Sequence, residues 1–208
     1  AVGATGALIL LPGCTRHIEE ATPRAGSVAA PIVAAQVVDL LSPNVLGAEG
    51  NLFADAQPER CAGLAREVDP PFIEAQSPVA TDGGHWTTPD AAVYIEEMVA
   101  VYRYDFDPSA ALDLARQTLD DCRDVSVTVT TMQDRTYVFD AFPAPAQQPD
   151  GSVIWQLRAV DWNCDNTFVA AYNAAIEITA CGAAGGFDIA ELAEGALARI
   201  EALANTTA

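Results

Sequence analysis

The cysteines are the residues of this sequence whose types and spacing imply the most specific chemistry. There are five of them: Cys14, Cys61, Cys122, Cys164 and Cys181. A thiol can ligate a metal, form a disulfide, accept a covalent group or stay buried as a small apolar side chain. The sequence contains no CxxC pair and no Cys/His cluster. We therefore expect no metal site, which leaves disulfide formation, covalent modification or simple burial for these thiols.

Cys14 ends a short, apolar and uncharged stretch, AVGATGALILLPG. Leu11, Pro12, Gly13 and Cys14 resemble the bacterial lipobox, in which the cysteine thiol receives a diacylglycerol and the cysteine becomes the new N-terminus. Leu11 and Gly13 fit that pattern, whereas Pro12 stands where a small or β-branched residue is usual. We predict that residues 1–14 are a signal-peptide remnant with a lipobox. An ordinary secretory signal and a clipped transmembrane helix are the alternatives.

The sequence after Cys14 divides into a tether and a domain. Residues 15–30 are polar, contain alanine and proline, and show no periodicity, so we predict a flexible tether. Residues 31–208 carry the periodic apolar patterns of a folded domain. No apolar run reaches the length of a membrane-spanning helix. We therefore expect a domain on the extracytoplasmic face of the cell membrane, held there by a lipid anchor on Cys14.

The other four cysteines are even in number, which favours disulfides in an exported chain. If Tyr172 and Asn173 form a two-residue hairpin turn, Cys164 and Cys181 lie directly opposite each other, within disulfide reach. The remaining pair, Cys61 and Cys122, would then link two predicted helices through their buried faces. The alternative is that some of these thiols are free and buried.

Residues able to catalyse a reaction are few. His17 lies in the tether, and His85 lies beside Trp86 in a predicted loop, without a GxSxG nucleophile motif elsewhere in the chain. The neighbouring carboxylates Glu96 and Glu97 would point to opposite sides of a strand, so they do not form a dyad that shares a proton. No glycine-rich phosphate loop is present. We predict a protein that is not an enzyme and that needs no cofactor.

Candidates for ligand binding are aromatic residues and one histidine. His85 and Trp86 share a loop position, and Tyr102 and Tyr104 would lie on one face of a strand. Trp155 and Trp162 fall on opposite faces by parity, so one of them is available for a cleft. The predicted ligand-binding residues are His85, Trp86, Tyr102, Tyr104 and Trp155. Packing in the core is the alternative for the two tyrosines.

Charge narrows the possible partners. The chain has 29 acidic and 10 basic residues and a net charge of −19, and all the basic residues are arginine. A phosphate backbone or an anionic lipid surface would be repelled, so we do not expect nucleic acid as a partner or electrostatic docking on a membrane. The charge is compatible with a cationic, neutral or apolar partner.

The sequence predicts both helices and strands. Apolar periodicity predicts helices over 31–41, 58–68 and 107–122, and a final helix after Asp188, with Glu191 completing a capping box. Residues 81–90, TDGGHWTTPD, have the composition of a turn. Alternation predicts strands over 92–104, with a bulge possible at its two glutamates, and over most of 126–181. The expected class is α+β, with helices at the start, a run of antiparallel strands and a closing helix.

The spacing of Cys61, Cys122, Cys164 and Cys181, and the segment NCDNTFVAAYNAAIEITACG at 163–182, resemble the PknH-like extracellular sensor domain of mycobacteria. Asn173, Cys181 and Gly182 fit the family pattern in that segment. The family usually has a basic residue soon after the first cysteine of this segment, where this sequence has Asp165 and Asn166. The resemblance covers about residues 33–204. It implies a twisted, mostly antiparallel sheet with helices packed on it, two disulfides and a large open cleft. Free-standing lipoproteins with this domain are common in that group.

The predicted function is a lipid-anchored extracytoplasmic sensor domain that binds an unknown small molecule or envelope component in its cleft. A structural envelope lipoprotein that binds a protein partner is one alternative. A small secreted hydrolase, which would need a nucleophile near His85, is the other.

Overall fold

The computed structural model describes residues 31–47, 50–143 and 148–205. The predicted lipobox with Cys14 and the predicted tether at 15–30 lie outside these ranges, so both stay predictions.

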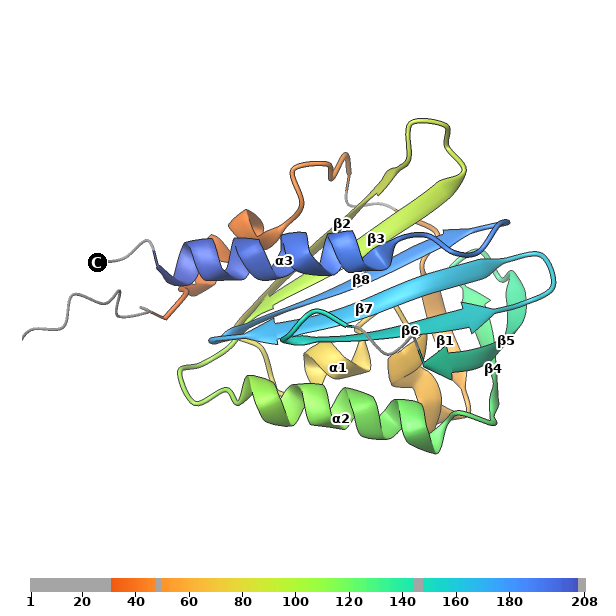
Figure 1. Ribbon diagram of the computed structural model, residues 1–208, viewed down its shortest axis with the longest axis horizontal. Helices are drawn as coiled ribbons and strands as arrows, with labels where there is room; N and C mark the ends of the chain where they lie inside the picture. Colours follow the sequence, from red (N-terminus) through yellow and green to blue (C-terminus); the bar gives the residue numbers. More distant parts are fainter. Residues whose placement is uncertain (1–30, 48–49, 144–147, 206–208) are drawn as a thin grey trace, which may run out of the picture.

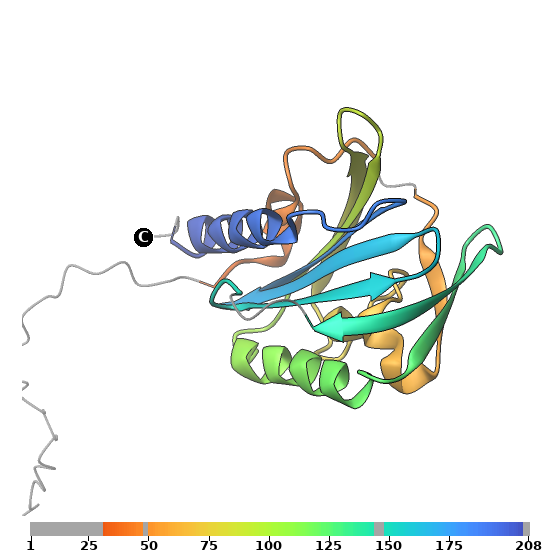
Figure 2. The same cartoon turned by 45° about the vertical axis from the view of Figure 1, so that its right-hand side comes forward.

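Within the described residues, eight strands form one antiparallel sheet in the order β1-β4-β5-β6-β7-β8-β3-β2. The sheet curls, so that β1, β4 and β5 rise opposite the far end of β2 and β3 and the whole resembles half of a barrel (Figures 1 and 2). The α+β class, the antiparallel sheet and the two disulfides are confirmed. The strands are β1 (Phe53–Gln57), β2 (Ala80–Thr87), β3 (Val93–Val101), β4 (Ser126–Thr131), β5 (Thr136–Pro143), β6 (Ser152–Arg158), β7 (Asn163–Ala171) and β8 (Ala174–Gly182).

The centre of the sheet is the predicted hairpin of β7 and β8. Tyr172 takes a positive φ of 52° in the turn, and Cys164 pairs directly with Cys181 across the ladder. Asn173 completes this end of the hairpin. Its Oδ1 accepts a hydrogen bond from the Ile32 amide, and its Nδ2 donates to the carbonyls of Ile32 and Tyr102, each at 2.9 Å. The turn therefore fixes the start of the domain as well as the hairpin.

Two apolar cores lie on the two sides of the curled sheet. One contains Ile154, Val169 and Ile176 together with α3 (Ile189–Ala204) and the 3-10 helix η1 (Ala34–Leu40). The other contains Trp155, Phe168 and Phe139 together with α2 (Pro108–Asp121), the short α1 (Pro71–Glu74) and the 3-10 helix η2 (Glu59–Leu64). Figure 1 shows α3 along one side of the sheet and α2 along the other. Alternating residues of the same strands enter the two cores, as the pleat requires.

Two of the predicted helices are shorter than expected. The segments 31–41 and 58–68 contain 3-10 helices of seven and six residues. The helix at 107–122 is confirmed: Asp107 accepts hydrogen bonds from the Ser109 and Ala110 amides. The predicted capping box of α3 is wrong because the Asp188 side chain makes no capping hydrogen bond. The Asp165 carboxylate instead accepts from the amides of Gly186 and Phe187 just before the helix.

The turn predicted at 81–90 is wrong, because most of this segment is the edge strand β2. Its glycines are required by a close approach of another segment rather than by a turn. A Cβ on Gly84 would lie 2.4 Å from Cγ1 of Val45 and 2.7 Å from the carbonyl oxygen of Gly47. The chain at 45–47 thus lies directly over β2, and Gly47 forms an isolated bridge with His85.

Strand β3 is shorter and more regular than predicted. It ends at Val101 rather than Tyr104, and it pairs without a bulge on both sides. Glu96 and Glu97 therefore point to opposite faces of the sheet, as the sequence predicted.

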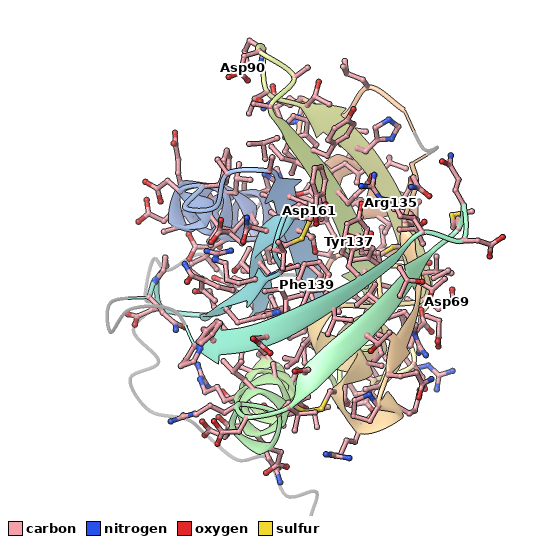
Figure 3. All side chains as sticks on the ribbon, turned by 90° about the vertical axis from the view of Figure 1, so that its right-hand side faces the viewer. Asp69, Asp90, Arg135, Tyr137, Phe139 and Asp161 are labelled. Atoms are coloured by element: carbon pink, nitrogen blue, oxygen red, sulfur yellow. A yellow bond between two sulfur atoms is a disulfide. The ribbon has the colours of Figure 1, made fainter. Side chains whose placement is uncertain are left out.

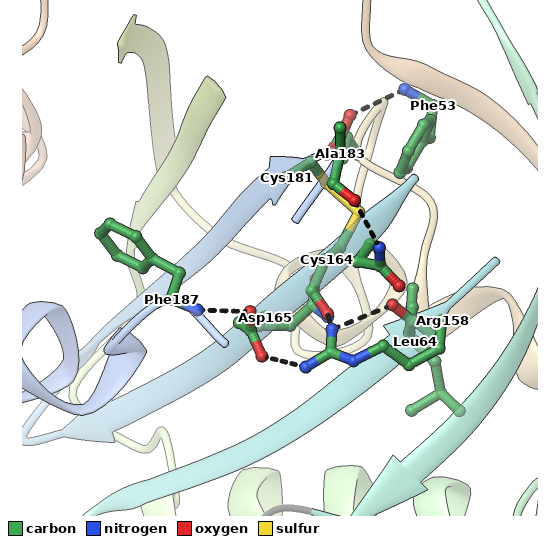
Figure 4. Close-up of a disulfide and its surroundings, with 12 residues drawn as sticks. Phe53, Leu64, Arg158, Cys164, Asp165, Cys181, Ala183 and Phe187 are labelled. Carbon is green, nitrogen blue, oxygen red and sulfur yellow. Dashed lines mark hydrogen bonds and ion pairs between the residues drawn. A yellow bond between two sulfur atoms is a disulfide. The ribbon is translucent and has the colours of Figure 1, made fainter. Parts of the chain in front are cut away.

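Both predicted disulfides are present. Cys61–Cys122 joins η2 to the end of α2, with the Cα atoms 5.9 Å apart, and Cys164–Cys181 joins β7 to β8 at 4.1 Å. Figure 4 shows the second disulfide close to the ion pair of Arg158 and Asp165. The first disulfide holds the α2 layer together, and the second lies on the side of the sheet that carries the pocket described below.

A buried ion pair ties β3 to the layer of α3 and η1. Glu97 is 3 % exposed, and its carboxylate accepts from Arg199 of α3 and from the Ser42 amide at 2.6 Å. Arg199 also donates to the carbonyl of Leu40 at 2.7 Å. Burial raises the pKa of Glu97, and Arg199 and the Ser42 amide act against that rise. Removal of the arginine would leave a buried carboxylate without its cation.

Replacement of Arg199 by methionine is expected to lower the free energy of unfolding by about 3 kcal/mol, because Glu97 loses its cation in a buried site. The control is Arg116→Met on the exposed face of α2, where the arginine pairs with Asp113 in solvent and the loss is expected to stay below about 1 kcal/mol. Urea unfolding followed by tryptophan fluorescence measures both variants. Equal losses in the two variants would contradict this role of the Glu97–Arg199 pair.

Candidate functional site

The side of the sheet that carries Cys164–Cys181 contains a pocket with a volume of about 560 Å³. Strand alternation brings its lining side chains to one face: Tyr94 and Glu96 of β3 pair in register with Cys181 and Thr179 of β8, and His85 of β2 lies next to Glu96. The curled part of the sheet provides the facing wall. The residues that line the pocket from that wall and its rim are Gly50, Asn51, Phe53, Glu67, Thr131, Gln133, Arg135, Tyr137 and Trp162.

Three aromatic rings form one wall of the pocket. Trp162, in the turn between β6 and β7, lies 6.3 Å from the ring of Tyr94 and 6.2 Å from that of Tyr137. The guanidinium of Arg135 lies over the ring of Tyr137, 5.0 Å from its centroid. Figure 3 looks onto this end of the molecule and shows Arg135 next to Tyr137 on β5. Aromatic rings joined in this way present flat apolar surface and electron-rich faces to a ligand.

Carboxyl groups form the opposite part of the pocket. Glu67 accepts a hydrogen bond from the Phe53 amide at 2.8 Å, and burial, assisted by the nearby charge of Glu96, raises its pKa to about 8. Burial also raises the pKa of Glu96 to about 7. The chain at Gly50 passes close to Glu96, since a Cβ there would lie 2.3 Å from the carboxylate. At neutral pH, these two carboxyl groups are therefore protonated to a larger extent than ordinary glutamates.

A second cavity of about 250 Å³ adjoins the first and shares Glu67, Glu96 and Thr179 with it. Glu177 of β8 lines this inner cavity, is 6 % exposed, and has an Oε2 atom without a hydrogen-bond partner in the described part of the chain. Its burial, and to a smaller extent Glu67, raises its pKa well above the ordinary range. The first cavity, named the outer cavity, thus has an aromatic wall, and the second, named the inner cavity, has a more acidic lining.

The structure places one of the five predicted ligand residues in the pocket. His85 lines the outer cavity, and its Nδ1 is buried without a hydrogen-bond partner among the described residues. Trp86, the next residue, points to the α3 core and is 6 % exposed. The pleat of β2 separates these two side chains, which the sequence analysis had grouped together.

The other three predicted residues lie away from the pocket. Trp155 is fully buried and donates from its indole nitrogen to the Leu64 carbonyl at 2.8 Å. Tyr102 is buried, stacks on Phe106, and donates from its hydroxyl to the Ile73 carbonyl. Tyr104 is 87 % exposed in the segment after β3. Because β3 ends at Val101, the predicted strand face shared by the two tyrosines does not exist.

Several lining residues were not predicted. Trp155 and Trp162 were expected on opposite faces, and so were Glu96 and Glu97. Either expectation could have suggested Trp162 or Glu96 as a pocket residue, but neither was chosen as a site residue. Tyr94, Tyr137 and Arg135 come together only because the sheet curls. Glu67 follows a short 3-10 helix and had no local signal.

The described residues were also searched for a metal site and for a membrane-spanning helix. They contain no group of three or more histidine, cysteine, aspartate or glutamate side chains placed to hold a metal ion. None of the helices in the described ranges has the length and hydropathy needed to span a bilayer.

Comparisons with known proteins agree with the fold. A family model for the PknH-like extracellular domain matches residues 24–199. The structure of the extracellular domain of PknH from Mycobacterium tuberculosis superposes with a TM-score of 0.63 at 16 % sequence identity, covering 85 % of this chain and 98 % of that one. No curated protein is similar in sequence. At this identity, the superposition establishes the fold alone.

The fold is a curled antiparallel sheet with two disulfides and a pocket. Disulfides are typical of extracellular domains. The chain belongs to the PknH-like extracellular domain family.

The raised pKa values predict how stability changes with pH. Glu67 and Glu96 have folded pKa values of about 8 and 7 against an ordinary 4.5, so the native state binds more protons than the unfolded state between these values. Their contribution to stability is therefore present below pH 4.5 and is lost as the pH rises through 7 and 8. Glu67→Gln, which keeps an acceptor for the Phe53 amide, is expected to reduce this loss and to be more stable than the wild type at the alkaline end.

Urea unfolding across the same pH range measures this difference, with Glu194→Gln on the exposed surface of α3 as a control that keeps the wild-type profile. A Glu67→Gln profile parallel to that of the wild type would contradict the assignment of a raised pKa to Glu67.

Proposed function

We propose that this protein is a lipid-anchored extracytoplasmic domain that binds a small ligand in the two adjoining cavities and has no catalytic activity of its own. The observation that carries the proposal is the lining of the pocket. Tyr94, Tyr137 and Trp162 offer aromatic surface there, beside carboxyl groups that are buried at a cost to stability. A core that served folding alone would be more stable with apolar residues in these places.

Two features support binding over catalysis. The described lining residues of the outer cavity include His85 but no serine, and their one cysteine is held in a disulfide. The aliphatic hydroxyls of this lining belong to Thr131 and Thr179, and neither makes a hydrogen bond to His85 in the described part of the chain. A nucleophile needs a base within hydrogen-bond reach.

The anchor rests on the sequence. Cys14 follows an apolar stretch in a lipobox-like setting, and the matched family consists of extracellular domains. A polar tether at 15–30 would hold the domain clear of the bilayer.

The pocket is tested by native mass spectrometry of the full chain exported by a mycobacterial host and never delipidated. We expect a reproducible extra mass that is lost on denaturation. The extra mass should be absent from Trp162→Ala, which removes the central ring of the aromatic wall, and retained in Tyr104→Ala, which removes an exposed ring outside the pocket. A bare protein mass in the wild type, or equal retention in both variants, would count against the proposed function.

The anchor is tested separately by Cys14→Ser expressed in the same host. The wild type is expected to partition into the detergent phase of a Triton X-114 extract, and the variant into the aqueous phase, because a hydroxyl does not receive the diacylglycerol. Thr15→Ala, which changes the neighbouring residue and keeps the thiol, is the control. If Cys14→Ser stays with the membrane fraction, the lipid anchor is excluded.

A further inference from the structure

We propose that the ligand is an organic cation whose ammonium group enters the inner cavity beside Glu177 and whose apolar body lies against Tyr94, Tyr137 and Trp162. This inference rests on the proposed function and adds the chemical class of the ligand.

The inner cavity presents hydrogen-bond acceptors that the protein leaves unused. Oε2 of Glu177 has no hydrogen-bond partner among the described residues although the residue is 6 % exposed, and such an atom costs free energy in a buried place. The Glu96 side chain, which lines both cavities, makes no hydrogen bond or ion pair with any described residue. An ammonium group carries up to three N–H donors and no acceptor, and this is the complement of such a set.

The described residues place no cation beside these carboxyl groups. The ion pairs of the described residues join other partners: Arg66–Glu59, Arg116–Asp113, Arg123–Asp120, Arg158–Asp165 and Arg199–Glu97. Among the described lining residues, Arg135 is the one with a positive charge, and it lies over Tyr137 in the aromatic wall rather than beside Glu177. Charge on Glu96 disfavours ionisation of Glu67, charge on Glu67 disfavours that of Glu177, and no described cation offsets either effect.

The outer cavity fits the remainder of such a ligand. The faces of Tyr94, Tyr137 and Trp162 attract both apolar groups and the positive charge next to them. Volumes of about 560 and 250 Å³ are in the range of small-molecule sites. An organic cation is favoured over a metal ion because the described carboxylates do not converge on one point as metal ligands do.

Binding is expected to release protons. A positive charge favours the ionised form of a carboxyl group, so the raised pKa values of Glu67 and Glu96 fall when the ligand enters. Affinity should therefore increase as the pH rises through 7 and 8 for an amine that stays protonated. The other charged or titratable groups that line the cavities are Glu177 of β8, His85 and Asp82 of β2, Tyr94 of β3, Tyr137 of β5 and Arg135 just before β5. The Glu97 carboxylate points to the opposite face of the sheet, where it pairs with Arg199.

The test uses three probes of similar size on the full chain: 2-phenylethylammonium, neutral 2-phenylethanol and anionic phenylacetate. Binding is followed through the indole N–H of Trp162 in two-dimensional NMR spectra of the ¹⁵N-labelled protein. We expect the cation to bind about tenfold more tightly than the alcohol, and phenylacetate to bind more weakly than either. Equal or tighter binding of the neutral or anionic probe overturns the proposal, as does the absence of a shift with any probe at millimolar concentration.

Glu177→Gln separates charge from shape. It should weaken binding of the cation by about tenfold and leave binding of the alcohol unchanged, while Glu194→Gln on exposed α3 changes neither. If Glu177→Gln does not fold, Glu67→Gln provides the same comparison, since its amide oxygen still accepts from Phe53. Unchanged affinity for the cation in the folded variant contradicts the assignment.

Failure of this inference is distinguishable from failure of the proposed function. A neutral or anionic ligand carried by the exported protein, and lost from Trp162→Ala, would overturn the cation and leave the binding function in place. A bare exported protein together with no response to any probe would remove both.

Discussion

The side-chain alternation along β3, held in one register between β2 and β8, is the constraint on which the site and its support both depend. One strand sends Glu96 into the pocket and its neighbour Glu97 into the layer of α3. A slip of one residue would exchange these two environments and move the ionisable groups of both faces at once. The hairpin turn at Tyr172 and the direct pairing of Cys164 with Cys181 fix the register of β8 against β7, and β3 pairs with β8 on its other side.

The two glutamates show two ways of burying the same chemical group. Glu97 has a guanidinium and a backbone amide as partners, so its charge is compensated and it joins β3 to α3. Glu96, Glu67 and Glu177 line the cavities on the other side without a cation from any described residue, and burial raises their pKa values. The first arrangement supports the fold, and the second is the arrangement expected of a site that is completed by a ligand.

Local patterns were sufficient for much of the fold. The β7–β8 turn, the Cys164–Cys181 disulfide and the helix at 107–122 follow from residues near one another in the chain, and the structure has them as predicted. The Cys61–Cys122 disulfide, which joins residues 61 positions apart, was predicted only as the remaining pair. Strand β2 was missed because Gly83 and Gly84 suggest a turn in isolation. They are instead needed for contacts with side chains and backbone far along the chain, as the close approach of Val45 to Gly84 shows.

The pocket was harder to predict because its two walls come from opposite ends of the curled sheet. Tyr94 and Glu96 could be placed on one face from alternation alone, whereas Tyr137 and Arg135 reach that face only after β5 has turned over it. Aromatic residues were therefore predicted to bind the ligand from their local sequence alone. Two of them, Trp155 and Tyr102, belong to the core. Glu67 and Glu177 have no local pattern that separates them from the many surface carboxylates of so acidic a chain.

The most direct measurement is a crystal structure of the full chain exported by a mycobacterial host and purified without added ligand. We expect an ordered molecule in both cavities, with a nitrogen within hydrogen-bond distance of Glu177 and an apolar part against Trp162. Cavities that hold only ordered water in protein that has never been denatured, or a bound molecule that lies elsewhere on the surface, would contradict it.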